Sequence, residues 1–253
     1  MSYNFDPNNN ILYVTNGGGC STNAINVSTM SSIILASLGV RVIKHVNNDS
    51  LKKCSGALFL KELGIKIASN INEVEEQFLN SGIVFIESIK GSEVENLCPL
   101  IAPNAYTTRF IGANQIEKAM SYLFELRRKN YSKAVVVVPS NSDFDEVSIC
   151  SSTQIFELRN EEISNYVINP EDFGICKAEP ITLTGATPLY NKNLALDIFS
   201  KKIKGPKADV LALNSGVMLY SIGFTDTIKK GIIAAYEALE SKKALCMLES
   251  LRS

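Results

Sequence analysis

Residues 11–44, ILYVTNGGGCSTNAINVSTMSSIILASLGVRVIK, decide the fold. The apolar run at 11–14 predicts a buried strand, and the glycine-rich segment after it contains residues that favour helix starts. A helix is expected to begin within residues 22–26 and to end at Leu38, and residues 40–44 predict the next strand. This order is a βαβ unit, in which the two strands are parallel.

The alternation of apolar runs and helical patterns continues along the chain. The valine run at 134–138 predicts a strand that is buried on both faces. We therefore expect an α/β fold, with a mostly parallel central sheet flanked by helices. The other expected elements are helices at 55–63, 72–79 and 115–128, strands at 83–86 and 109–111, a hairpin of 154–158 with 162–168, and three or four helices within 191–251.

The composition of the chain argues against several classes of function. The chain has 253 residues, of which 45% are hydrophobic, and this is enough for a substantial core. Its 25 basic and 26 acidic residues give a net charge of −1, which argues against a nucleic-acid or anionic-membrane partner. No apolar run approaches the roughly 18 residues that span a bilayer.

The cysteines and the single histidine argue against several kinds of metal and redox site. Six cysteines are scattered without a C-x-x-C pair, so a zinc ribbon or a thioredoxin-type motif is not expected. With no signal peptide at the polar N-terminus, they are interpreted as reduced thiols of a cytoplasmic protein. One histidine excludes a His-rich metal cluster.

Ligands of parallel sheets bind at the carboxyl ends of the strands, so the loops after Val14, Lys44 and Val138 are the candidate site. The first loop contains Asn16 and the triplet Gly17, Gly18 and Gly19. Its backbone N–H groups and the helix that follows could hold a phosphate, although a glycine triplet is more often only a tight turn.

Polar residues follow at the start of the first helix. Asn26, Ser28 and Thr29 could contact a ligand or a magnesium-bound water, or could simply cap the helix. After the second strand, Lys44 could meet a phosphate as a point charge. His45 alone is more often a packed residue with a satisfied hydrogen bond, and Asn47 could belong to a turn.

Acidic residues follow the valine-rich strand. Asp143, Asp145 and Glu146 lie within a few residues of its end. Mg²⁺ takes one or two carboxylates together with phosphate oxygens of a substrate, so Asp145 and Glu146 suit it. The alternative is a solvated acidic loop.

The order of these features resembles one family, the anthranilate phosphoribosyltransferases of tryptophan biosynthesis, whose fold is shared with pyrimidine nucleoside phosphorylases. The family motif GTGGD, followed by N-[IV]-S-T, aligns with residues 16–20 and 26–29, and its KHGN motif aligns with residues 44–47. The DE-V-S motif is intact at 145–148. Further family segments align with residues 53–64, 95–103, 185–188 and 205–209.

The resemblance implies transfer of a phosphoribosyl group from phosphoribosyl pyrophosphate (PRPP) to anthranilate or a related aromatic amine, with release of pyrophosphate and with Mg²⁺ as cofactor. No side chain is assigned as nucleophile or base. His45 and Asn47 match acceptor-binding positions, and Ser28, Asp145 and Glu146 match metal-binding positions. The positions implied to bind PRPP are Asn16, Gly17, Gly18, Gly19, Asn26, Ser28, Thr29, Lys44 and Lys53.

This chain departs from the family pattern at several places. Cys20 and Leu58 replace family aspartates, and the segment between Glu87 and Asn96 is shorter than usual, without the acceptor-binding arginine. The family's N-terminal small helical domain is expected to be largely missing, with residues 66–100 as a candidate remnant beside a single α/β domain, so the family dimer is not assumed. The alternatives are a catalytically degenerate member that binds a phosphorylated ligand or a partner, and a nucleoside phosphorylase.

Overall fold

The computed structural model describes residues 11–16, 24–46, 55–87, 106–110, 113, 115–131, 133–140 and 144–252. Within them the strands are β1 (Ile11–Asn16), β2 (Arg41–Val46), β3 (Ile83–Glu87), β4 (Tyr106–Phe110), β5 (Lys133–Pro139), β6 (Thr153–Arg159) and β7 (Glu162–Ile168). The α-helices are α1 (Val27–Ser37), α2 (Gly56–Leu63), α3 (Ile71–Ser81), α5 (Ile116–Arg128), α6 (Pro188–Phe199), α7 (Pro206–Ser221), α8 (Ile228–Glu240) and α9 (Lys243–Ser250). Short 3₁₀ helices, η1 and η2, cover Pro170–Phe173 and Pro180–Leu183.

The strands form one sheet in the order β3-β2-β1-β4-β5-β6-β7. The pairings from β3 to β5 are parallel, and β6 and β7 join as an antiparallel hairpin. This confirms the α/β class and the mostly parallel sheet. Asn160 and Glu161 form the tight hairpin turn with φ angles of 50° and 68°, the left-handed geometry that two-residue hairpin loops require.

Two elements begin three residues earlier than the sequence predicts. The strand expected at 109–111 is β4, which begins at Tyr106, because the aromatic and β-branched residues before Arg109 also favour a strand. Helix α6 begins at Pro188 rather than at Asn191. The Thr187 side chain accepts a hydrogen bond from the Tyr190 N–H, and proline fits the first helical position.

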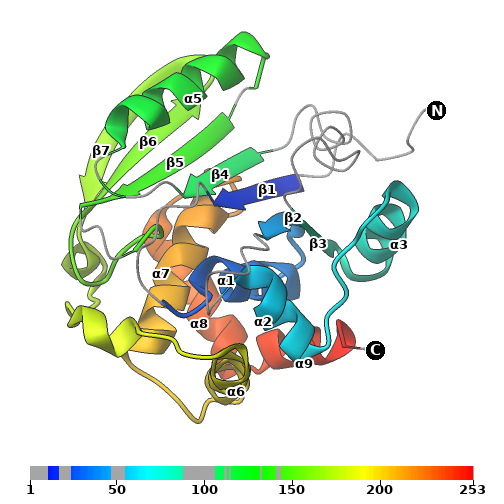
Figure 1. The fold of residues 1–253 in the computed structure, drawn as a ribbon. Coiled ribbons are helices and arrows are strands. Elements are labelled where there is room, and N and C mark those ends of the chain that lie inside the picture. The colour runs from blue at the N-terminus through cyan, green and yellow to red at the C-terminus, as the bar shows by residue number, and fades with distance from the viewer. Residues whose placement is uncertain are drawn as a thin grey trace.

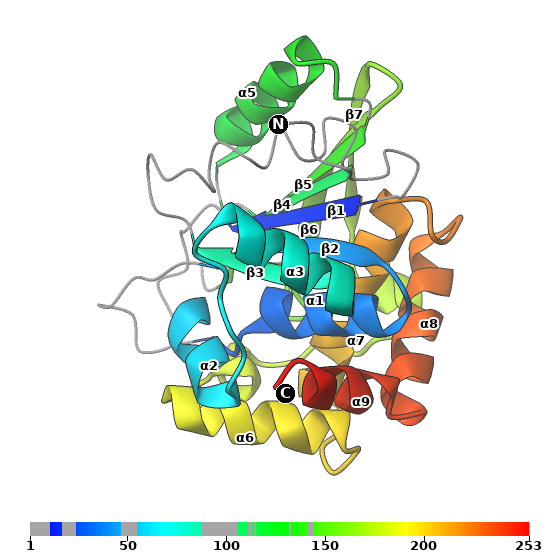
Figure 2. The same ribbon diagram turned by 90° about the vertical axis from the view of Figure 1, so that its right-hand side faces the viewer.

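Helices cover both faces of the sheet (Figures 1 and 2). Helix α5 packs on β5 and β6, and α3 packs on β3. The opposite face is covered by α1 and α7, against which α8 and α9 pack as a further layer. Residues 71–87 form α3 and β3, whereas residues 88–105 lie outside the described residues, so both the remnant domain and the single-domain organisation stay predictions.

Helix α1 lies in the middle of the molecule. Its residues from Val27 to Ala36 are all buried, because the sheet covers one side while α7 and α9 cover others. A helix that is enclosed all round lacks a polar face, and the hydroxyls of Ser31 and Ser32 bond to backbone carbonyls. Ser31 Oγ donates to Leu211 O at 3.2 Å, and Ser32 Oγ donates to Ser28 O at 2.8 Å.

Helices α7 and α8 cross in direct backbone contact. A Cβ added at Gly216 would lie 2.5 Å from Ile232 Cγ1 and 2.8 Å from Ile232 N. A Cβ added at Gly231 would lie 2.6 Å from Gly216 O. Both positions therefore require glycine, and the two helices pack more closely than any side chain would allow.

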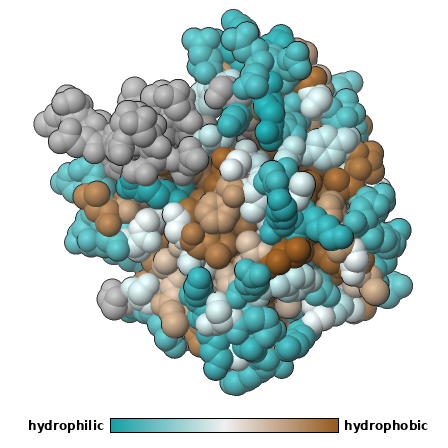
Figure 3. Space-filling view, turned by 180° about the vertical axis from the view of Figure 1, so that it is seen from behind, coloured by the Kyte–Doolittle hydropathy of each residue, from teal (hydrophilic) through white to brown (hydrophobic). Residues whose placement is uncertain are grey.

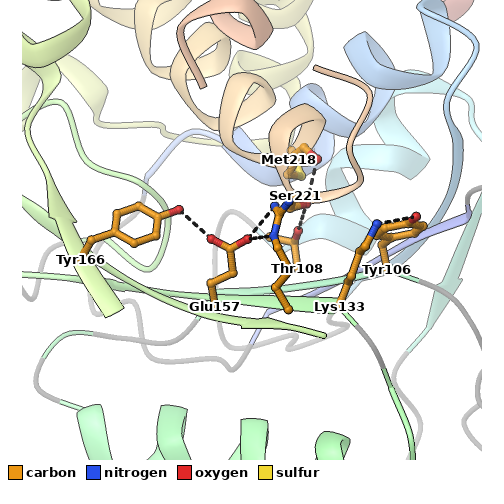
Figure 4. Close-up of polar contacts among 8 residues, drawn as sticks. Tyr106, Thr108, Lys133, Glu157, Tyr166, Met218 and Ser221 are labelled. Carbon is orange, nitrogen blue, oxygen red and sulfur yellow. Dashed lines mark hydrogen bonds and ion pairs between the residues drawn. The ribbon is translucent and has the colours of Figure 1, made fainter. Parts of the chain in front are cut away.

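A polar cluster lies between the hairpin and the end of α7, where Thr108 Oγ1 and Ser221 Oγ are 3.1 Å apart (Figure 4). The Glu157 carboxylate accepts from Arg159 Nε at 2.7 Å and from the Tyr166 hydroxyl at 3.3 Å. Burial and the charge of Glu157 raise the pKa of Tyr166, so Tyr166 remains a donor. The Arg159 guanidinium stacks over Tyr220, 5.1 Å from the ring centroid. These contacts connect β6 with β7 and, through Arg159 and Tyr220, with α7.

The surface seen from behind is hydrophilic above and below, with apolar residues gathered in its middle (Figure 3). Large exposed hydrophobic side chains include Leu79 and Ile181, and scattered residues of this kind are ordinary on protein surfaces. In the described part of the chain, no helix combines the length and the apolar character needed to cross a membrane.

Candidate active site

The sheet register divides the predicted site residues between its two faces. Lys44 pairs with Val14, which pairs with Thr108 on its other side. Val14 belongs to the core formed with α1 and α7, so this row faces those helices. Because side chains alternate along a strand, the next residue, His45, faces the side covered by α3 and α5.

Lys44 is almost completely buried, with 2% of its surface exposed. Burial lowers the pKa of its ammonium group to about 7, and the negative charge of Glu146 opposes that shift. A buried lysine needs an anionic partner to keep its charge. An anion next to Lys44 would therefore favour the charged form of its ammonium group.

Glu146 lies against the first turn of α1. Its carboxylate accepts hydrogen bonds from the backbone N–H and the hydroxyl of Ser28. Burial and the neighbouring charge of Asp145 nevertheless raise the pKa of Glu146 to about 7, although Lys44 and Ser28 act in the opposite direction. Asp145 and Glu146 are 4% and 8% exposed. The structure thus brings Lys44, Ser28 and Glu146 together.

Asn214 fixes the backbone directly after these carboxylates. Its side-chain oxygen accepts from Val147 N at 2.9 Å, and its nitrogen donates to Val147 O at 2.9 Å and to Val210 O at 2.8 Å. The amide is completely buried, with no exposed surface. Helix α7 thereby holds the segment that carries Asp145 and Glu146.

Asn26 precedes α1 but does not cap it. Its side chain makes no capping hydrogen bond, and its Oδ1 accepts instead from Asn191 Nδ2 of α6 at 2.9 Å. Simple helix capping, the alternative interpretation of this residue, is therefore wrong for Asn26. The side chain belongs to a network at the point where the N-terminal end of α1 can attract an anion.

Thr29 is buried beside the start of α2. Ser55 caps that helix, since its Oγ accepts from Leu58 N at 3.3 Å. At Gly56 an added Cβ would lie 3.3 Å from Val46 Cβ and 3.8 Å from Thr29 Oγ1. Ser55 therefore caps α2, and Gly56 is the small residue at the point where α2 approaches β2.

His45 is buried on the other face of the sheet. Its Nε2 is hydrogen-bonded to the Tyr13 hydroxyl, and the two rings meet edge to face. Burial lowers the pKa of His45 to about 4, and the charges of Lys44 and Arg109 contribute in the same direction. Arg109 itself stacks over Tyr122 of α5, 4.4 Å from the ring centroid. His45 is thus neutral at pH 7.

The acidic pair suits a hard cation shared with a phosphate ligand. Among the described residues, no three His, Cys, Asp or Glu side chains form a metal-binding group. Mg²⁺ usually takes one or two carboxylates and completes its shell with water and phosphate oxygens. Burial and, after it, the neighbouring charge of Asp145 raise the pKa of Glu146, and a bound cation would favour the ionised form of both carboxylates.

Comparison with known proteins agrees with this arrangement. Residues 8–90 and 87–245 match the family described as "Glycosyl transferase family, a/b domain". Anthranilate phosphoribosyltransferase of Persephonella marina is 31% identical over 252 residues, which cover 93% of this chain and 74% of that protein. The chain belongs to the anthranilate phosphoribosyltransferase family. A second family member, from Methanococcoides burtonii, is 33% identical over 92% of this chain and 70% of its own length.

Solved structures of the family share the fold. Anthranilate phosphoribosyltransferase from Thermus thermophilus superposes with a TM-score of 0.78 at 25% identity, covering 96% of this chain and 78% of that one. The Saccharomyces cerevisiae enzyme in complex with PRPP and Mg superposes with a TM-score of 0.79 at 21% identity, covering 96% and 72%.

Part of the predicted family site lies outside the described residues. This applies to Gly17, Gly18, Gly19, Asn47 and Lys53, and for Asn16 only the backbone is described. The roles assigned to these residues, and the acceptor role of His45, stay predictions. The predicted residues that are described lie at three places. Asn26 directly precedes α1, which contains Ser28 and Thr29. Lys44 lies on β2, and Asp145 and Glu146 lie in the segment held by α7.

Two asparagines of this family member were not predicted from the sequence. Asn214 interrupts the apolar run VLALNSGVML of α7, and a polar residue in such a run is a detectable sign of a buried hydrogen-bond network. Asn191 follows the G-x-T-P segment. It carries no comparable signal, because its partner Asn26 is 165 residues away.

Proposed function

We propose that this chain transfers the 5-phosphoribosyl group of PRPP to the amino nitrogen of anthranilate, or of a related aromatic amine, and releases pyrophosphate. The observation that carries the proposal is the grouping of Lys44, Ser28 and Glu146 at the start of α1. It combines a cation, a helix N-terminus and an acidic pair, as a magnesium-bound polyphosphate requires. Family membership supports the same reaction.

Lys44 and the start of α1 would bind the anionic groups of PRPP. A phosphate next to Lys44 raises the pKa of the buried ammonium group from about 7, so the lysine is fully charged in the complex. Asn26 and Thr29 would orient the ribose and its phosphates with neutral hydrogen bonds. This pre-organised set acts on charge that develops as the leaving group departs.

Asp145, Glu146 and the Ser28 hydroxyl would hold Mg²⁺. When bound, the ion supplies positive charge that neutralises the departing pyrophosphate. Asn214 would keep both carboxylates in place, because it fixes Val147 through its N–H and its carbonyl.

The transfer itself forms one bond and breaks another. The lone pair of the amine attacks C1′ of the ribose, the bond from C1′ to the pyrophosphate oxygen breaks with its electrons, and the nitrogen loses a proton. Positive character at C1′ makes positioning the main requirement, so no protein nucleophile is needed. We also propose a cytoplasmic location, because exposed thiols such as Cys176 and Cys246 suit a reducing compartment.

The test combines binding and turnover. Isothermal titration with PRPP in the presence of Mg²⁺ should show binding, and the fluorescence of anthranilate should fall as it is consumed. Binding of PRPP without turnover of anthranilate or any related amine would support the degenerate alternative. Phosphate-dependent release of a free base from a nucleoside would support the phosphorylase alternative instead.

A further inference from the structure

A buried asparagine of α6 reaches across to the start of α1. Asn191 has no exposed surface, and a buried amide in the interior of a helix is unfavourable unless its polar atoms are bonded. Its Oδ1 accepts from the backbone N–H of Ala186 at 3.3 Å, and its Nδ2 donates to Asn26 Oδ1 at 2.9 Å. Both ends of the side chain are therefore committed.

The two hydrogen bonds fix the direction of both amides. A backbone N–H can only donate, so the group that faces Ala186 must be the oxygen of Asn191. Its nitrogen then points to Asn26 and requires an acceptor there, which is the oxygen of Asn26. The amide of Asn26 consequently keeps its oxygen toward α6, and its nitrogen is the end that can donate hydrogen bonds elsewhere.

The surrounding backbone leaves little freedom for this arrangement. Ile25 N donates to Leu183 O at 3.1 Å, and Ala24 forms a bridge with Thr184. At Gly185 an added Cβ would lie 2.8 Å from Asn191 Oδ1 and 2.9 Å from Ala24 O. The segment before α6 is thus locked to the segment before α1.

We propose that Asn191 is a positioning residue for PRPP binding: it sets the amide of Asn26 so that a donor, not an acceptor, is presented to the anionic ligand at the start of α1. The inference rests on the proposed function. Asn191 would determine which end of the Asn26 amide faces the ligand. It would do so from α6 through one hydrogen bond, without contacting the ligand itself.

The decisive variant is Asn191→Asp, which is nearly isosteric. A carboxylate still accepts from Ala186 N–H but cannot donate to Asn26, so the Asn26 amide should turn and direct its oxygen toward the ligand. We expect the KM for PRPP and its dissociation constant to rise on the order of 30-fold. The KM for anthranilate should stay within about twofold, and kcat should change much less than the KM for PRPP.

Three comparisons separate this role from a structural one. Asn191→Leu removes both hydrogen bonds without reversing polarity, so it should weaken PRPP binding less than Asn191→Asp even where its Tm falls further. Lowering the pH should partly restore PRPP affinity in Asn191→Asp relative to the unchanged protein, because a protonated carboxyl group can donate again. Asn165→Asp, on exposed β7 where Asn165 accepts from Gln154, is the matched control and should leave both KM values unchanged.

A second variant keeps the proposal testable if Asn191→Asp does not fold. In Asn26→Asp the Asn191 nitrogen retains an acceptor, while the donor toward the ligand is lost, so PRPP affinity should fall by a similar factor. PRPP affinity within twofold of the unchanged protein, in either folded variant, would overturn the inference. Failure of the unchanged protein to bind PRPP would instead overturn the proposed function.

Discussion

Glu146 and Glu157 are both buried carboxylates, 8% and 6% exposed, yet their surroundings differ in kind. Glu157 accepts from the guanidinium of Arg159 and from the hydroxyl of Tyr166, so its charge is compensated within the hairpin. Glu146 accepts from Ser28 but lies next to a second carboxylate, and burial together with that neighbouring charge raises its pKa to about 7.

The difference separates structure from function. A buried carboxylate with donors on both oxygens holds secondary-structure elements together, as Glu157 does between β6 and β7. A buried carboxylate beside another one remains unfavourable until a cation binds, which is typical of functional sites. Substitutions at the two positions should therefore have opposite effects.

The largest effect is expected for Glu146→Gln. It removes a charge needed to hold Mg²⁺ and should lower kcat for phosphoribosyl transfer about a thousand-fold, or ~4 kcal/mol. Thermal stability should not fall, because burial and the charge of Asp145 already disfavour the ionised form of Glu146. Initial rates and thermal melts measure both, and an unchanged kcat would remove Glu146 from the proposed site.

Asn214→Ala tests the support of the same segment. Losing the amide leaves Val147 N–H, Val147 O and Val210 O without their side-chain partner, so the free energy of unfolding should fall by about 3 kcal/mol. The Mg²⁺ concentration for half-maximal activity should also rise. Urea unfolding and a Mg²⁺ titration of the rate are the measurements, with Asn165→Ala on β7 as the control.

Glu157→Gln should reverse the pattern of Glu146→Gln. The free energy of unfolding should fall by about 2 kcal/mol, below the usual loss for a broken buried pair because Arg159 is 41% exposed. The KM for PRPP should not change. A large change in that KM with unaltered stability would contradict the division between the two carboxylates.

The smallest effect concerns pH. The pKa of His45 is lowered from 6.5 to about 4, so the unfolded chain binds a proton that the folded chain does not. Stability from this group is therefore lost as pH falls from about 6.5 toward 4, by about 1 kcal/mol between pH 7 and pH 5.5. Chemical denaturation at both pH values should show a smaller pH dependence for His45→Gln. An equal dependence in both proteins would contradict the lowered pKa.

Local patterns in the sequence predicted most of the fold. The valine run of β5, the hairpin around Asn160 and the helix ends at glycine depend on neighbouring residues, so the sequence contained enough information. The start of α6 was misplaced because Thr187 and Pro188 were interpreted as a motif rather than as a cap and a first helical residue.

The sequence predicted the grouping of those site residues whose chemistry and place near a strand end both pointed to one ligand. Lys44, Ser28 and Glu146 were expected together because carboxyl ends of parallel strands meet at one edge, and the structure groups them. The opposite direction of His45 follows from strand alternation and could have been predicted. The partnership of Asn191 with Asn26 could not, since it depends on how α6 packs against α1.

The backbone contact between Gly216 and Gly231 has a consequence for how freely this chain can change its sequence. Gly216 lies two residues after Asn214, so a methyl group at either glycine would push α7 away from α8 and carry the asparagine with it. A substitution at either glycine would therefore also disturb the segment that carries Asp145 and Glu146, because Asn214 holds that segment. Selection for catalysis would therefore retain glycine at both positions, although their role is only to let the two helices approach.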